Sequence, residues 1–198
     1  LEDAWAEWQV VFMEWIQWYD VFPDPAPSTT HSNGVLRGNT LPFPHKLATW
    51  VDLAISDKDT ADFTAFVTWW VWWKQQHKCI FIVDALARRM DFSETANVLE
   101  DYHRRQSEKY KHTKHEVVVE TVGYQLAMEN FLKKNSKMDI IGKKPSWTKR
   151  ERLILTTDLI RSGRINFPRT EAGIMLAEQI VWVGKERHDD LVDAFIMM

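Results

Sequence analysis

The chain has 198 residues, of which 45% are hydrophobic and 27% charged, which is enough apolar material for one buried core and excludes wholesale disorder. Its formal net charge is −3, with 25 Lys and Arg against 28 Asp and Glu, so any nucleic-acid contact would need a local basic face. The single cysteine, Cys79, excludes an internal disulfide and a cysteine-based zinc site and is typical of a reducing compartment.

No stretch of the sequence has the pattern of a membrane span. None reaches the ~18 uncharged apolar residues that a spanning helix needs, and no basic and apolar leader begins the chain. We therefore expect an intracellular protein without a membrane partner. Because the sequence begins at Leu1 rather than Met, we also expect it to be a piece of a longer protein.

Aromatic residues recur through residues 1–22 at alternating spacings of three and four, which predicts an amphipathic helix. These residues are Trp5, Trp8, Phe12, Trp15, Tyr19 and Phe22. The stripe has two possible functions, packing against a neighbouring part of the protein or stacking of DNA bases. Five of the seven prolines follow within residues 23–44, so we predict that residues 1–45 form an N-terminal arm or interdomain linker.

Residues 46–198 alternate between strand and helix patterns and form the predicted globular domain. Runs of apolar, β-branched and aromatic residues predict strands over 47–56, 62–73, 78–87 and 115–122, the first two paired as a hairpin. Helical patterns follow over 93–110, with Ser93 as the N-cap, and over 123–135. Three strands, a helix, a strand and a helix predict an α/β fold with a mixed sheet.

Two acids interrupt otherwise apolar strands. Asp52 lies within the first predicted strand and Glu120 within the fourth. An ionised carboxylate removed from water costs several kcal/mol unless it is paired or binds a metal. For either acid alone, a strand-end carboxylate that caps a neighbouring turn is the alternative interpretation.

Three more acids, Asp189, Asp190 and Asp193, lie at the start of the final apolar segment, "DDLVDAFIMM". On a helix, the pairs three and four residues apart share a face and repel each other by a few tenths of a kcal/mol. A bound cation would turn that repulsion into attraction. The alternative is an acidic first turn that complements the helix dipole, and both interpretations can hold together.

Carboxylates from two strands and one helix are suitable ligands for Mg²⁺ or Mn²⁺, which prefer oxygen donors. Two such ions held ~4 Å apart activate a water and stabilise the leaving oxygen of a phosphodiester. The acids therefore predict a two-metal site for phosphodiester hydrolysis.

Four stretches carry a family resemblance: residues 12–20, 51–67, 117–125 and 165–198. They resemble the C-terminal nuclease domain of the large terminase subunit of tailed bacteriophages, within the RNase H-like superfamily. The resemblance implies an RNase H-like mixed β-sheet flanked by α-helices, and a metal-dependent endonuclease that cuts double-stranded DNA concatemers during genome packaging. Its implied partners are the terminase ATPase domain, the small terminase subunit and the portal, in the cytoplasm of the host cell.

The resemblance also implies roles for individual acids. It places the catalytic metal ligands on Asp52, Glu120 and Asp190. Asp193 is the next candidate ligand, because the related Holliday-junction resolvases have two helix acids three residues apart, and Asp189 is a further one. Asp62 resembles the family's accessory acid near the metals, although it is also interpretable as a hairpin residue facing water. His188 either ligates or orients a metal, or pairs with a neighbouring acid.

Basic residues gather in residues 133–152, which hold six Lys and two Arg. We predict that this segment contacts the phosphates of DNA through Lys143, Lys144, Lys149, Arg150 and Arg152. The alternative is a solvated charged loop. A second basic cluster, residues 103–115, is predicted to be a helix end and turn.

The sequence contains no phosphate-binding loop of the G-x-x-x-x-G-K-[ST] type, since "GKK" at 142–144 lacks the upstream glycine and the hydroxyl residue. We therefore expect a nuclease domain separated from its ATPase, able to cut DNA but not to pump it. Two other classes stay open: a different RNase H-like nuclease, such as a Holliday-junction resolvase, and a non-catalytic docking module.

Overall fold

The computed structural model describes residues 10–20, 46–54, 63–74, 77–111, 113–121, 123–183 and 189–197. A 3-10 turn, η1 (Met13–Trp15), comes first. The strands are β1 (Gln17–Tyr19), β2 (Lys46–Asp52), β3 (Thr64–Lys74), β4 (His77–Arg88), β5 (His115–Glu120), β6 (Asp139–Lys143) and β7 (Ile165–Pro168). The helices are α2 (Phe92–Lys109), α3 (Tyr124–Asn135), α4 (Lys149–Arg161), α5 (Glu171–Val181) and α6 (Asp190–Ile196).

The strands of the described residues form one mixed sheet in the order β1-β7-β4-β3-β2-β5-β6. β2, β3 and β4 pair antiparallel, which confirms the predicted hairpin. The other pairs, β2 with β5, β5 with β6, β4 with β7 and β7 with β1, are parallel. The predicted α/β fold with a mixed sheet is therefore confirmed.

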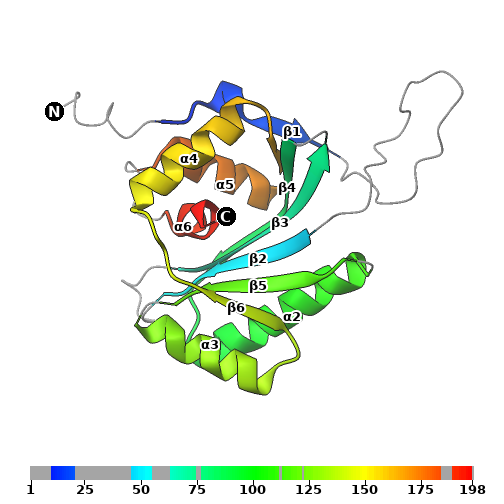
Figure 1. Cartoon of the computed structure of the whole chain (residues 1–198), viewed down its shortest axis with the longest axis vertical. Helices are drawn as coiled ribbons and strands as arrows, with labels where there is room; N and C mark the ends of the chain where they lie inside the picture. The colour runs from blue at the N-terminus through cyan, green and yellow to red at the C-terminus, as the bar shows by residue number, and fades with distance from the viewer. Residues whose placement is uncertain are drawn as a thin grey trace, which may run out of the picture.

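Helices cover both faces of the sheet, with α4, α5 and α6 on one side and α2 and α3 on the other (Figure 1). Successive side chains of a strand point to opposite faces, so each central strand supplies both layers. Val67 of β3 packs in the core that contains Phe195 of α6, whereas its neighbour Phe66 packs with Leu99 of α2 and Met128 of α3. None of the described helices is long and apolar enough to cross a membrane.

The helix predicted for residues 1–22 is wrong where the structure describes it, over residues 10–20. There the chain makes the turn η1 and then the edge strand β1, which pairs with β7. Pairing with β7 supplies backbone hydrogen bonds, and Trp18 packs against Phe167, a contact that only the folded sheet provides. Trp5, Trp8 and Phe22 lie outside the described residues. β1 belongs to the sheet, while the division of the chain at residue 45 stays a prediction.

The strand predicted over 78–87 is confirmed as β4, which extends it by one residue at each end. The predicted N-cap of α2 is wrong, because α2 is capped by Asp91 rather than Ser93. The Asp91 carboxylate accepts the backbone N–H of Glu94 at 2.7 Å, so it takes the N-cap role for which Asp and Ser are both suited.

Gly173 lets α5 pack closely on β7. A Cβ atom at this position would lie 2.1 Å from the carbonyl oxygen of Pro168, which is a backbone atom that cannot turn aside. α5 also contacts α6, where Oε1 of Gln179 accepts the backbone N–H of Leu191 at 3.2 Å.

Candidate active site

Asp52 and Glu120 lie at the carboxyl ends of two adjacent parallel strands, β2 and β5. The strand register pairs Val51 with Val119, so the next residues along each strand are these two acids. The carboxyl ends of parallel strands meet at one edge of a sheet, where open α/β folds place their ligand sites. Gln125, in the first turn of α3, donates from Nε2 to Oδ1 of Asp52 at 3.4 Å.

Helix α6 brings further acids to this edge because it packs over β2 and β3. Asp190 is only 6% exposed, and its Oδ1 accepts the backbone N–H of Phe63, just before β3, at 3.0 Å. Asp193 lies one turn further along the same helix, half-buried. Asp189 occupies the N-cap position of α6 but its side chain makes no capping hydrogen bond, so capping alone does not account for the cluster.

Lys149 neutralises part of this charge. Its Nζ donates to the carboxylates of both Asp189 and Asp193, the latter at 2.9 Å. The lysine is placed by the start of α4, where Thr148 and Glu151 form a reciprocal capping box. Burial by itself would lower the pKa of Lys149, but the hydrogen bonds and charges of the two aspartates outweigh it, and the net shift is upward.

Among these acids, Asp52 has a large upward pKa shift. Burial, followed by the negative charges of Asp193, Glu120 and Asp190, raises the pKa of Asp52 to about 7, and Lys149 opposes this only in part. Burial likewise raises the pKa of Glu120 and of Asp193, although the positive charge of Arg152 works against both shifts. The structure thus brings Asp52, Glu120, Asp190 and Asp193 into one electrostatically coupled group.

The donor chemistry of this group fits a hard divalent cation, because every candidate ligand is a carboxylate and a cation would relieve their mutual repulsion. As the side chains stand, no three His, Cys, Asp or Glu residues in the described part of the chain converge closely enough to hold a metal ion. Lys149 engages two of the acids in this arrangement. Asp62 and His188 lie outside the described residues.

A family model with the description "Terminase RNaseH-like domain" matches residues 49–198, which is most of the chain. The chain belongs to this family. Its matched region includes Asp52, Glu120 and the acids of α6. A comparison with curated protein sequences finds no match.

Solved structures support the fold of this terminase RNase H-like domain. The manganese-bound nuclease domain of the large terminase from bacteriophage SPP1 is 17% identical, with a TM-score of 0.55 over 94% of this chain and 96% of that one. The magnesium-bound large terminase nuclease from the thermophilic phage G20c is 15% identical, with a TM-score of 0.52 over 77% of this chain and 79% of that one. The RNase H-like mixed sheet flanked by helices is therefore confirmed.

The basic residues of the terminase domain are distributed over several elements. Residues 133–152 contribute the end of α3, all of β6 and the first turn of α4, with an exposed connection between β6 and α4. Within this segment Lys133 pairs with Glu129, and Lys143 donates to the main-chain oxygen of Met197 at 3.3 Å. Lys149 bonds the acids of α6, a role that the sequence prediction of phosphate contact missed.

Two contributions to the site were not predicted from the sequence. Gln125 contacts Asp52 across a gap of more than 70 residues, and a lone glutamine in a helix indicates no such contact. Arg152 follows Lys149 by three residues, so the two share one side of α4, and its charge acts on Glu120 and Asp193. That spacing is the one pattern from which a joint role of Lys149 and Arg152 was predictable.

Proposed function

We propose that this terminase RNase H-like domain is a divalent-metal-dependent endonuclease that cuts double-stranded DNA concatemers during phage genome packaging. The observation that carries the proposal is the convergence of Asp52 and Glu120 with the α6 acids at one edge of the sheet, where burial, followed by the charges of Asp193, Glu120 and Asp190, raises the pKa of Asp52 to about 7. Perturbed carboxylates that gather at a sheet edge are typical of catalytic sites.

Asp52, Glu120 and Asp190 are the proposed catalytic residues and metal ligands, with Asp193, Asp189 and Asp62 as the further ligands. Mg²⁺ or Mn²⁺ in a two-metal arrangement would supply an activated water and stabilise the leaving oxygen of the phosphodiester. The backbone N–H of Phe63 holds the Asp190 carboxylate, and Gln125 holds that of Asp52, so both acids are oriented before any ligand enters. When no other cation is bound, Lys149 neutralises part of the negative charge of Asp189 and Asp193.

The proposed DNA contacts are made by basic residues around β6 and the start of α4: Lys143, Lys144, Lys149, Arg150 and Arg152. One of them, Arg152, is close enough to Glu120 for its positive charge to oppose the upward pKa shift of that acid. Cations at these positions would bind phosphates without reading the base sequence.

The proposed setting is the packaging motor of a phage in the cytoplasm of its host cell. The proposed partners are the ATPase domain, the small terminase subunit and the portal, with residues 1–45 as an arm or linker toward the ATPase. Support for this setting comes from membership of the terminase family and from the SPP1 relative, which is a nuclease domain of a large terminase.

Cleavage of supercoiled plasmid in Mn²⁺, Mg²⁺ or EDTA tests the proposal. We expect metal-dependent nicking and linearisation by the native chain, lost in Asp52→Asn and in Asp190→Asn. The matched control is Asp101→Asn, which removes an acid from the exposed surface of α2, on the other face of the sheet.

Each contrary result has a specific meaning. A folded native chain that cuts nothing with either metal contradicts the proposal and favours the docking-module class. Activity that survives both substitutions shows that these acids are not the catalytic ones. Competition in which branched DNA displaces duplex at much lower concentration assigns the metal site to a resolvase.

A further inference from the structure

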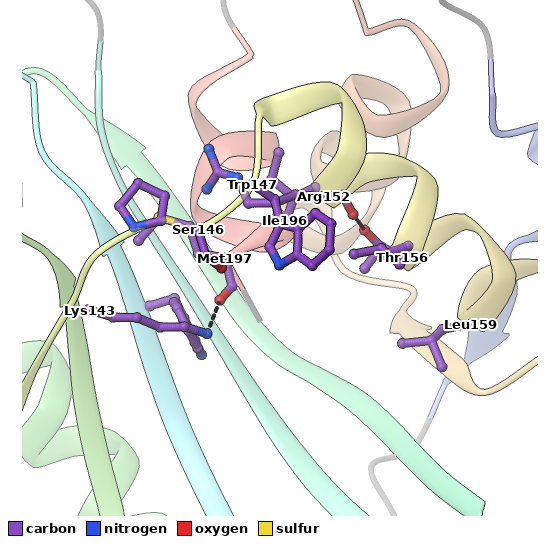
Figure 2. Close-up of a pocket in the computed structure, with 11 residues that line it drawn as sticks. Lys143, Ser146, Trp147, Arg152, Thr156, Leu159, Ile196 and Met197 are labelled. Atoms are coloured by element: carbon purple, nitrogen blue, oxygen red, sulfur yellow. Dashed lines mark hydrogen bonds between the residues drawn. The ribbon is translucent and has the colours of Figure 1, made fainter.

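A pocket of about 230 Å³ opens beside the acid cluster, between β6, the segment that leads into α4, α4 itself and the end of α6 (Figure 2). Sites for whole small-molecule ligands usually measure about 300–1,000 Å³. The volume therefore suits one planar group of a larger ligand better than a complete small molecule.

Aromatic rings line the pocket. Trp147, just before α4, is 56% exposed, whereas Trp50, Trp69 and Trp70 are buried. Trp50 forms part of the wall and stacks on Trp69 behind it, with ring centroids 6.2 Å apart. The exposed ring of Trp147 provides a stacking surface, and every nucleobase has a face that can use it.

The same pocket carries two cations. Lys143 lies 4.5 Å from the centroid of the Trp50 ring, and Arg152 lines the pocket from α4. Burial, followed by the positive charges of Lys46 and Arg152, lowers the pKa of Lys143. Indole rings and cations together match a ligand that has both a planar apolar part and an anionic part.

Arg152 strengthens the case for an anion. Its Nε and Nη1 are shielded from solvent and donate to no acceptor within the described part of the chain. A buried donor without an acceptor is costly, so an anionic oxygen that entered here would be bound strongly. The positive charge of Arg152 also opposes the upward pKa shift of Glu120, so the pocket lies near one of the proposed catalytic acids.

We propose that this pocket receives one unpaired nucleotide of the DNA strand beside the scissile phosphate, with the base stacked on Trp147 and a phosphate bound by Arg152 and Lys143. The inference rests on the proposed nuclease function and adds a specificity subsite to it. A base inside a duplex must first leave its stack, which costs a few kcal/mol, whereas a base in an overhang or frayed end is already available. The domain therefore binds DNA with an unpaired end more tightly than blunt duplex.

Fluorescence anisotropy of labelled DNA in EDTA tests this subsite without any cleavage. The probes are a blunt duplex and the same duplex with a three-nucleotide single-stranded overhang. The native chain prefers the overhang probe. Trp147→Ala weakens binding of that probe about tenfold, the effect expected for one stacked base, and changes blunt-duplex binding less than twofold. Trp147→Phe, which retains a ring, restores most of the preference.

Arg152→Gln provides a second variant, expected to weaken binding of the overhang probe more than binding of the blunt one. The control is Phe131→Ala, which removes a partly exposed ring, 42% accessible, from α3 on the other face of the sheet. Thermal unfolding confirms that each variant is folded.

Three results overturn the proposal. They are a native chain that binds both probes equally or binds neither, a Trp147→Ala chain that keeps its overhang preference, and an equal loss on both probes. An equal loss assigns Trp147 to general DNA contact, and binding of neither probe points to a protein partner for the pocket. If the plasmid assay shows no cleavage while Trp147→Ala still removes the overhang preference, the nuclease function fails and the nucleotide pocket stands.

Discussion

Replacing Asp52 with Asn removes a buried negative charge from the acid cluster while keeping the size of the side chain. In the folded protein burial and the neighbouring acids raise the pKa of Asp52 from 3.8 to about 7. In the unfolded chain the group titrates near its ordinary value. Between these two pKa values the folded state holds a proton that the unfolded state has lost, so the free energy of unfolding falls as the pH rises from about 4 to about 7.

The size of the effect follows from the two pKa values. At 1.36 kcal/mol per pKa unit, the difference between 3.8 and about 7 corresponds to about 4 kcal/mol of lost stability above pH 7. Asn at this position does not titrate. We therefore expect the variant to exceed the native chain in stability by about 2 kcal/mol at pH 5 and about 4 kcal/mol at pH 8, although it is inactive.

Urea unfolding in EDTA, followed by circular dichroism from pH 5 to pH 8, measures this difference. Asp101→Asn is the control, since Asp101 is half-exposed on α2 and lies outside the acid cluster. Millimolar Mn²⁺ should reduce the advantage of Asp52→Asn, because a ligand that binds only the folded native site stabilises it. A difference between native and Asp52→Asn that stays constant from pH 5 to pH 8 would refute the assigned coupling among the acids.

Three more predictions concern residues around the site and in the core. Lys149→Met should bind Mn²⁺ about fivefold more tightly than the native chain in isothermal titration, because it removes a partly buried ion-pair partner, worth ~1 kcal/mol, that competes for the acids; unchanged or weaker binding contradicts this role. Gly173→Ala should lower the free energy of unfolding in urea by about 1–3 kcal/mol, because its Cβ would meet the carbonyl oxygen of Pro168; full stability would show that α5 can shift freely. Burial, followed by the charge of His103, lowers the pKa of His115 to about 3, so the stability that depends on neutral His115 is present above pH 6.5 and is lost as the pH falls toward 3. His115→Asn should therefore flatten the thermal stability profile on the acid side of pH 6.5, and an unaltered profile would contradict the assignment.

Local patterns in the sequence were sufficient to predict the class of fold and to single out acids that the structure brings together. The β-branched and aromatic runs identified the hairpin of β2 and β3, and their registers bear it out. Asp52 and Glu120 stood out because each interrupts an apolar strand, and the α6 acids because three of them fall within five positions. Each of these signals is contained in a short stretch of sequence, where residue spacing and side-chain type carry the information.

Only the tertiary structure decided what these residues contact. The aromatic spacing of residues 10–20 suits a helix, but pairing with β7, almost 150 residues later, makes part of the segment a strand. The sequence predicts that Lys149 contacts a DNA phosphate. In the structure, the packing of α4 against α6 brings its amino group within hydrogen-bond distance of Asp189 and Asp193. Burial and three neighbouring acids from two other elements set the pKa of Asp52. Such contacts join distant parts of the chain, and their strength depends on distance and burial, neither of which a local pattern specifies.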